Sequence, residues 1–119
     1  MPDQIMQKLN EMQARCDAAT EGPWEHLNPR NTYNHAVVDS HGEDLANDYE
    51  GVWYFEEDAE FIASARTDMP RLIDALKAVL ELHQPVPYAQ GSDYCDECEH
   101  PAPCQTVQAI ATALGADDE

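Results

Sequence analysis

An α+β fold is predicted by three features of this 119-residue chain. Apolar residues recur at helical spacing in several segments, a weaker β-like region lies between them, and three cysteines cluster near the end. We expect a small antiparallel sheet of two or three strands packed against about four helices, with a C-terminal segment stapled by zinc. The length is that of one domain, and no linker-like stretch divides it, so residues 1–119 are predicted to form a single domain.

The first helix is expected within residues 1–20. Its apolar residues recur at spacings of four, three and four: Ile5, Leu9, Met12 and Cys16. Gly22 and Pro23 follow and favour a break in the helix. Because Cys16 lies on this stripe, we interpret it as a small hydrophobe and not as a metal ligand.

Residues 21–57 carry a β-like pattern. Short runs suited to strands are Trp24 to Leu27, His35 to Asp39 and Val52 to Phe55, separated by Asn-, Pro- and Gly-containing turns. Ser40-His41-Gly42 is a candidate hairpin turn. Since an isolated hairpin is barely stable, these strands are expected to pack against the helices.

Residues 58–83 predict a broken helix. Pro70 interrupts its apolar face, and Thr67-Asp68-Met69-Pro70 is typical of a helix start, so a second helix is expected from Met69 to Leu82. Residues 84–119 should begin with an extended link at Pro85 and Pro87 and continue into a zinc knuckle. A last short helix follows the knuckle, with its apolar face formed by Val107, Ile110 and Leu114.

The cysteine cluster predicts a structural zinc site. Cys95 and Cys98 have the C-x2-C spacing that lets two thiolates reach one ion from a tight loop, and Cys104 adds a third sulfur. Free or disulfide-bonded thiols are the alternative, but disulfide frameworks are rare in a reducing cytoplasm. A thioredoxin-like redox motif would need a βαβ context, which this chain lacks.

A closed zinc site needs a fourth ligand. His83 is favoured, because it lies at the end of the long helix and would tie that helix to the knuckle. His100, inside the loop, is the alternative, and an acid such as Asp96 or a water is a further one. Three thiolates and one neutral histidine leave no open position for catalysis, so the metal would be structural.

The charge balance is extreme, with 24 acidic against 6 basic side chains and a net charge of −18. This field disfavours direct binding to nucleic acids or membranes and favours basic protein surfaces or cations. A plain solubilising surface is the other interpretation. The predicted partner-binding residues are acids of the middle segment: Asp39, Glu43, Asp44, Asp48, Glu50, Glu56 and Glu57.

The remaining histidines and basic residues carry no recognised catalytic pattern. His26, His35 and His41 lie among acids, but their spacing matches no hydrolytic or metal motif, so surface positions are expected. Arg66 is expected to pair with Glu60 or Asp68, a surface pair of little energetic value. We therefore predict that the protein is not an enzyme.

Two stretches of the chain contain recognisable phrases: residues 18–25 are similar to "AATPGPW", with Glu21 at the usual proline, and residues 58–70 are similar to "DAEFIAxARTDxP". With these phrases the chain resembles a family of small, mostly uncharacterised phage and prophage proteins common in actinobacteriophages. Residues 82–107 resemble actinobacterial segments that join an "LH-x-P" helix end to C-x2-C and "PCPTV", with Gln105 for a proline. In that resemblance the repeated histidine corresponds to His83, while no function comes with the family.

Taken together, these features predict a phage-encoded acidic accessory protein that binds and modulates or inhibits a host protein with a basic surface, and an anti-defence factor is one form of this role. One alternative is a DNA mimic that inhibits a nucleic-acid-binding protein, and others are a small hydrolase or a structural assembly protein. The stripe from Ile5 to Cys16 would also suit a homodimer. No segment resembles a signal peptide or a membrane span, so a location in the cytoplasm, that of the host if phage-encoded, is expected.

Overall fold

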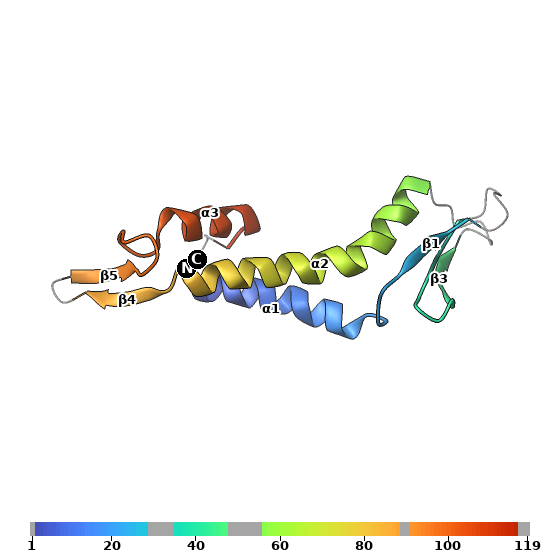
Figure 1. Ribbon diagram of the computed structural model, residues 1–119, viewed down its shortest axis with the longest axis horizontal. Coiled ribbons are helices and arrows are strands. Elements are labelled where there is room, and N and C mark those ends of the chain that lie inside the picture. Colours follow the sequence, from blue (N-terminus) through green and yellow to red (C-terminus); the bar gives the residue numbers. More distant parts are fainter. Residues whose placement is uncertain (1, 29–34, 48–55, 89–90, 117–119) are drawn as a thin grey trace. The chain divides into compact units, whose positions relative to one another are not determined.

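A computed structural model describes residues 2–28, 35–47, 56–88 and 91–116, and confirms an α+β fold (Figure 1). The described residues form three helices, α1 (Pro2–Ala18), α2 (Glu56–Leu82) and α3 (Gln105–Leu114). They also form two antiparallel sheets, one of β1 (Glu25–Leu27), β2 (Ala36–Val38) and β3 (Asp44–Asn47), the other of β4 (Pro85–Tyr88) and β5 (Gly91–Cys95). The chain divides into two compact units, which we call the terminal unit (Met1–Ala14 with Leu72–Glu119) and the central unit (Arg15–Arg71). The prediction of a single domain stays a prediction.

The central unit contains the three-stranded sheet in the order β1-β2-β3. The expected turn at residues 40–42 connects β2 to β3: the N–H of Asp39 donates to the carbonyl of Glu43 at 2.9 Å, and the N–H of Gly42 to that of Asp39 at 3.0 Å. Gly42 has φ of 85°, a left-handed conformation that glycine adopts without steric cost. Strand β3 was not predicted, and the expected strand at Val52 to Phe55 lies outside the described residues.

A small apolar cluster joins this sheet to the first half of α2. Val37, Ala59 and Ala63 are at most 6% exposed, and Trp24 and Ile62 pack against them. All three residues of β2 are buried, as expected for the middle strand of a sheet covered by a helix. The described part of the central unit's core is therefore made mostly of small side chains.

The break predicted at Pro70 is wrong, because α2 runs without interruption through it. Proline removes one backbone donor and costs about 3 kcal/mol inside a helix. The buried stripe nevertheless continues on both sides of Pro70, with Ala63 before it and Ile73 and Leu80 after it. Burying a large aliphatic side chain contributes roughly 1.5–3 kcal/mol, so two of them offset the proline. Although α2 has 27 residues, no helix in the described ranges is long and apolar enough to cross a membrane.

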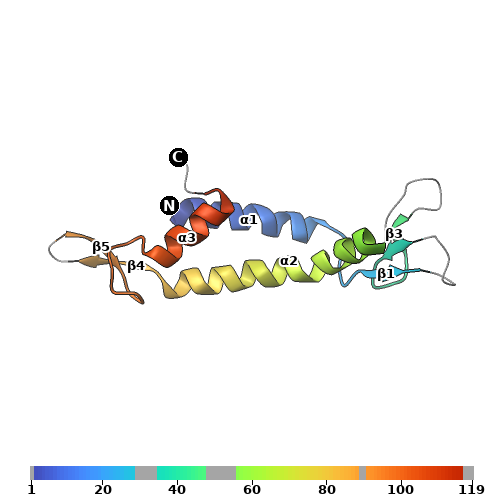
Figure 2. The same cartoon turned by 90° about the horizontal axis from the view of Figure 1, so that it is seen from above.

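The terminal unit combines helix faces with the β4–β5 hairpin, which leads from the end of α2 toward α3 (Figure 2). One face of each helix is buried: Ile5 and Leu9 of α1, Ile73 and Leu80 of α2, Val107 and Ala111 of α3. Ile5 and Leu9 are 0% exposed and are therefore covered by the chain itself, whereas Met12 and Cys16 of the same stripe are half-buried, and the homodimer stays a prediction.

Pro85 and Pro87, for which the sequence predicted only an extended link, belong to strand β4. Pro85 pairs with Cys95 and Val86 with Tyr94, and the register shifts between Val86 and Tyr88, that is, at Pro87. Proline lacks an N–H but is tolerated in an edge strand or at an irregularity, and β4 pairs only with β5 in the described sheet. The hairpin brings Cys95 back toward the end of α2.

Candidate metal centre

Four side chains from separate parts of the terminal unit meet at one point. His83 directly follows α2, Cys95 ends β5, Cys98 lies in the turn after it, and Cys104 precedes α3. The Nδ1 atom of His83 lies 3.4, 3.2 and 3.5 Å from the sulfurs of Cys95, Cys98 and Cys104. The four potential ligand atoms all lie within 4.8 Å of one another.

These distances fit a tetrahedral metal ion. With metal–sulfur bonds of about 2.3 Å and a metal–nitrogen bond of about 2.0 Å, a tetrahedron places the nitrogen roughly 3.5 Å from each sulfur. Cys95 and Cys104 are 1% and 2% exposed, and His83 and Cys98 are half-buried, so solvent reaches the group only partly. All four cysteines of the chain are free thiols. The group is therefore close enough, and of the right chemical type, to bind one metal ion.

Backbone hydrogen bonds shape the turn that carries Cys95 and Cys98. The N–H of Cys98 donates to the sulfur of Cys95 at 3.4 Å, and the N–H of Glu99 to the carbonyl of Cys95 at 2.9 Å. Glu99 has φ of 61°, which reverses the chain. The N–H of Cys95 then donates to the carbonyl of His100 at 2.7 Å and closes the loop.

The end of α2 is held against this turn by further bonds. The N–H of His83 lies 3.2 Å from the carbonyls of Val79 and Leu80, so His83 still belongs to the last helical turn. The carbonyl of Gln84 accepts the N–H of Asp96 at 3.1 Å. His83 therefore reaches the sulfurs from a fixed backbone position.

The start of α3 lowers the pKa of one thiol. Burial raises the pKa of Cys104, but the N–H groups of Val107 and Thr106, together with the neighbouring thiols, outweigh burial and lower it to about 6. The hydrogen bond with Cys104 is the main cause that raises the pKa of Cys98 to about 11, and burial adds to it. Without a cation Cys104 thus favours the thiolate at neutral pH and Cys98 the thiol, and a bound metal would offset the cost of deprotonating Cys98.

His100, the alternative fourth ligand, is not among the atoms brought together. Its side chain is exposed, and it serves the loop through its backbone carbonyl. Asp96 is also exposed and contributes a backbone N–H. Within the described residues, His83 with the three cysteines is the only group of this kind.

Two of the other histidines meet in the central unit, although surface positions were expected for them. The Nε2 atom of His26 lies 2.9 Å from Nδ1 of His35, and the rings stack with centroids 5.1 Å apart. His41 stays exposed at the hairpin turn. Asp39 does not join the pair, because its Oδ1 accepts the N–H groups of His41 and Glu43, each at 2.9 Å.

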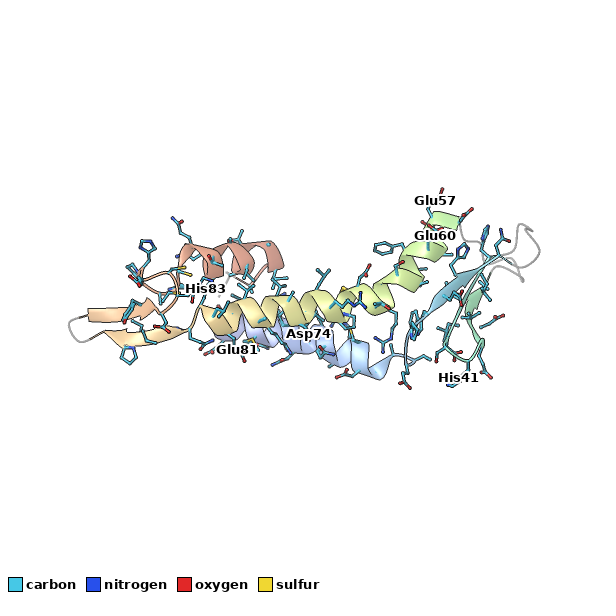
Figure 3. The ribbon with its side chains drawn as sticks, viewed as in Figure 1. His41, Glu57, Glu60, Asp74, Glu81 and His83 are labelled. Atoms are coloured by element: carbon cyan, nitrogen blue, oxygen red, sulfur yellow. The ribbon has the colours of Figure 1, made fainter. Side chains whose placement is uncertain are left out.

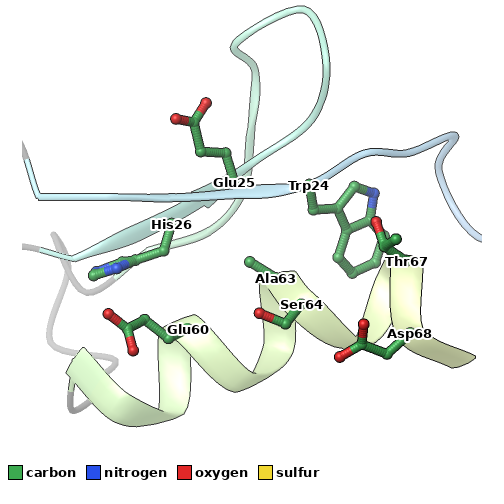
Figure 4. Close-up of a pocket in the computed structure, with 8 residues that line it drawn as sticks. All are labelled: Trp24, Glu25, His26, Glu60, Ala63, Ser64, Thr67 and Asp68. Carbon is green, nitrogen blue, oxygen red and sulfur yellow. The ribbon is translucent and has the colours of Figure 1, made fainter.

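An open cleft beside His26 was missed by sequence reasoning (Figure 4). It has a volume of about 420 Å³. One side is formed by Trp24 and strand β1, and the other side by helix α2. Its lining residues are Trp24, Glu25, His26, Glu60, Ala63, Ser64, Thr67 and Asp68. A polar helical stripe at positions 60, 64, 67 and 68 was the available signal, but it does not reveal which element faces it.

The acids predicted to bind a partner are mostly at the surface. Glu43, Asp44, Glu56 and Glu57 are exposed, and Figure 3 shows Glu57 near the beginning of α2. Asp39 instead stabilises the turn. Asp48 and Glu50 lie outside the described residues.

No protein-family model, no curated protein and no solved structure matches this chain.

Proposed function

We propose that this protein is an acidic binding protein stabilised by structural zinc, a phage accessory protein that binds and modulates a basic host protein. The observation that carries the proposal is the uncompensated negative charge. The terminal unit and the central unit each have nine more acidic than basic side chains. Such a field attracts basic surfaces and speeds their association, and it repels nucleic acids. The phage origin rests on the resemblance of residues 18–25 and 58–70.

Zinc is the metal that suits the donor set. Three thiolates and one imidazole nitrogen in a tetrahedron are a common structural zinc set, and soft sulfur ligands disfavour magnesium and calcium. With four protein ligands the ion has no open position for water or substrate. The metal therefore supports the fold, and function belongs to the surface.

The metal assignment is tested on protein purified without added metal. Elemental analysis is expected to give one zinc per chain, and cobalt exchange should produce the visible absorption of a tetrahedral thiolate site. Protein that contains no metal and does not take up cobalt would contradict the assignment.

The binding role is tested by capture of partners from a lysate of the bacterial host. A tagged full-length chain is expected to retain a basic protein at low salt and to release it as the salt concentration rises. The same pair should re-form from purified components. Failure to retain any protein at low salt would reject the role.

A DNA mimic remains the second candidate, since Glu56, Glu57, Asp58 and Glu60 are all exposed in the first turns of α2. A mimic requires that the captured partner bind nucleic acid. Duplex DNA should then compete with the protein for that partner, and absence of competition would leave only the general binding role.

A further inference from the structure

The open cleft of the central unit has two different walls. One is formed by Trp24 and strand β1, whose alternation turns Trp24 and His26 toward α2 and Glu25 away from it (Figure 4). The other is the polar stripe of α2, on which Ser64 and Thr67 lie between Glu60 and Asp68. We call this cleft the acidic slot. Its volume of about 420 Å³ is within the roughly 300–1,000 Å³ of ligand sites.

Among the described residues, no cationic side chain is paired with either carboxylate of the slot. Arg66 was expected to pair with one of them, but its Nε donates to the carbonyl of Thr20 at 2.9 Å. Its guanidinium lies 6.0 Å from the ring centre of Trp24. Within the described residues, no hydrogen bond or ion pair involves Glu60 or Asp68. Their charge is therefore available to a ligand.

We propose that the acidic slot receives a lysine or arginine side chain from a basic segment of the protein partner. Glu60 and Asp68 are eight residues apart on α2, about 12 Å along the axis, so a cationic group in the slot can contact one carboxylate while the other adds to the negative field around it. The hydroxyls of Ser64 and Thr67 line the space between and accept further hydrogen bonds. Trp24 offers an apolar wall on which the methylene stem of the side chain packs.

This inference rests on the proposed function and gives it a contact point. The general field of the chain attracts any basic surface, whereas the slot distinguishes a side chain that enters it from one that stays outside. At physiological ionic strength exposed charges are screened beyond about 8 Å. Binding through contacts inside the slot should persist at this ionic strength, whereas attraction by the long-range field should be largely lost.

The test uses the full chain and two probes, octalysine and octaarginine, at physiological ionic strength. Binding is followed by NMR through the backbone amides of α2 and the indole N–H of Trp24, assigned with a Trp24→Phe variant. The test variant is Glu60→Gln with Asp68→Asn. Its control is Asp74→Asn with Glu81→Gln, which removes the same charge from exposed positions farther along α2 (Figure 3).

The test variant should bind the peptides about tenfold more weakly, as expected for one lost charge contact and a weaker local field, whereas the control should lose less than about twofold in affinity. A second pair adds a tethered ammonium: Ser64→Lys fills the slot and should weaken binding, whereas Ala78→Lys, exposed on the same helix, should not. In the unmodified chain, shifts should concentrate on Trp24 and residues 60–68.

Two results separate failure of the slot from failure of the proposed function. If the peptides bind but both double variants lose affinity equally, the slot is not the contact point, while a charge-driven binding role stands. If the unmodified chain binds neither peptide yet retains a basic host protein, the slot is again rejected. If it binds neither peptide and retains no host protein, both proposals fall.

Discussion

The terminal unit and the central unit carry the same excess of negative charge but are held together by different means. In the terminal unit the group of His83 and three cysteines joins the end of α2, the β4–β5 hairpin and the start of α3, and buried faces of the three helices add a core. The central unit depends on a small cluster around Val37 and on the hydrogen bonds of one hairpin turn. Self-repulsion acts on both. The comparison teaches that a metal ion would stabilise one unit, whereas the described residues of the other are held by packing and hydrogen bonds.

The largest expected effect is loss of the metal. Removing a ligand by His83→Ala should abolish stoichiometric zinc binding and destabilise the terminal unit, because structural zinc contributes about 10–16 kcal/mol in small peptides. Hydrogen exchange should show amides of β4, β5 and α3 losing protection by about 100-fold or more. Amides of β1–β3 should change much less.

The matched control is His100→Ala. Since His100 contributes only its backbone carbonyl to the knuckle, this variant should keep its zinc and its protection pattern. Loss of zinc from the His100 variant with retention in the His83 variant would reverse the ligand assignment. Equal loss of protection in both units would show that they do not differ in their dependence on the metal.

A smaller effect is expected from the core of the central unit. Val37 is 1% exposed and lies at the centre of the cluster with Ala59 and Ala63. Val37→Ala leaves a cavity and should lower the free energy of unfolding by about 2 kcal/mol, measured by chemical denaturation.

Zinc content should not change in this variant, in contrast to His83→Ala. The exposed Leu72→Ala provides a comparison, because its side chain is 61% exposed and little burial is lost. A Val37 variant as stable as the unmodified chain would mean that the central cluster contributes little.

The smallest effect concerns pH and Asp39. The N–H of Glu43 is the main cause that holds the pKa of Asp39 below its usual value of 3.8, and His41 contributes further. A carboxylate whose pKa is lowered on folding stabilises the folded state above the unfolded pKa and loses that contribution as pH falls through the folded pKa. The hairpin turn should therefore loosen only below about pH 4.

This effect is measured by NMR as exchange of the amides of His41 and Glu43 between about pH 6 and pH 2, a range that brackets the ordinary pKa of aspartate. Asp39→Asn keeps an accepting oxygen but should remove the pH dependence, whereas Asp39→Ala should loosen the turn at every pH. Identical acid profiles for the unmodified chain and the Asn variant would show that Asp39 does not act through its charge.

Local signals predicted much of the fold. The spacing of Ile5 and Leu9 predicted a buried helix face. Ser40-His41-Gly42 predicted a turn, which is closed by hydrogen bonds among Asp39, Gly42 and Glu43. Both features involve residues close in sequence, so they can be predicted from the local sequence pattern. The ligand types and the C-x2-C loop were predicted for the same reason.

Although His83 was favoured as a ligand from the sequence, several other features that depend on distant residues were not predicted. Pro70 was taken as a break because its local cost is visible in the sequence, whereas the burial of Ile73 and Leu80 that offsets it is not. The pairing of β4 with β5 was missed because prolines dominate β4, yet an edge strand needs few of its N–H groups. The acidic slot was missed because its two walls are more than 30 residues apart in the chain.

The sequence by itself determined the chemistry of this protein: three thiols and candidate histidines for a soft metal ion, and an acid excess suited to basic partners. Only the tertiary structure decided which histidine meets the sulfurs. Both His83 and His100 are near the cysteines in sequence, but the end of α2 brings Nδ1 of His83 to within 3.5 Å of all three, while the tight knuckle leaves the His100 side chain exposed. Residue types are local, whereas a tetrahedron of ligands is a property of the fold.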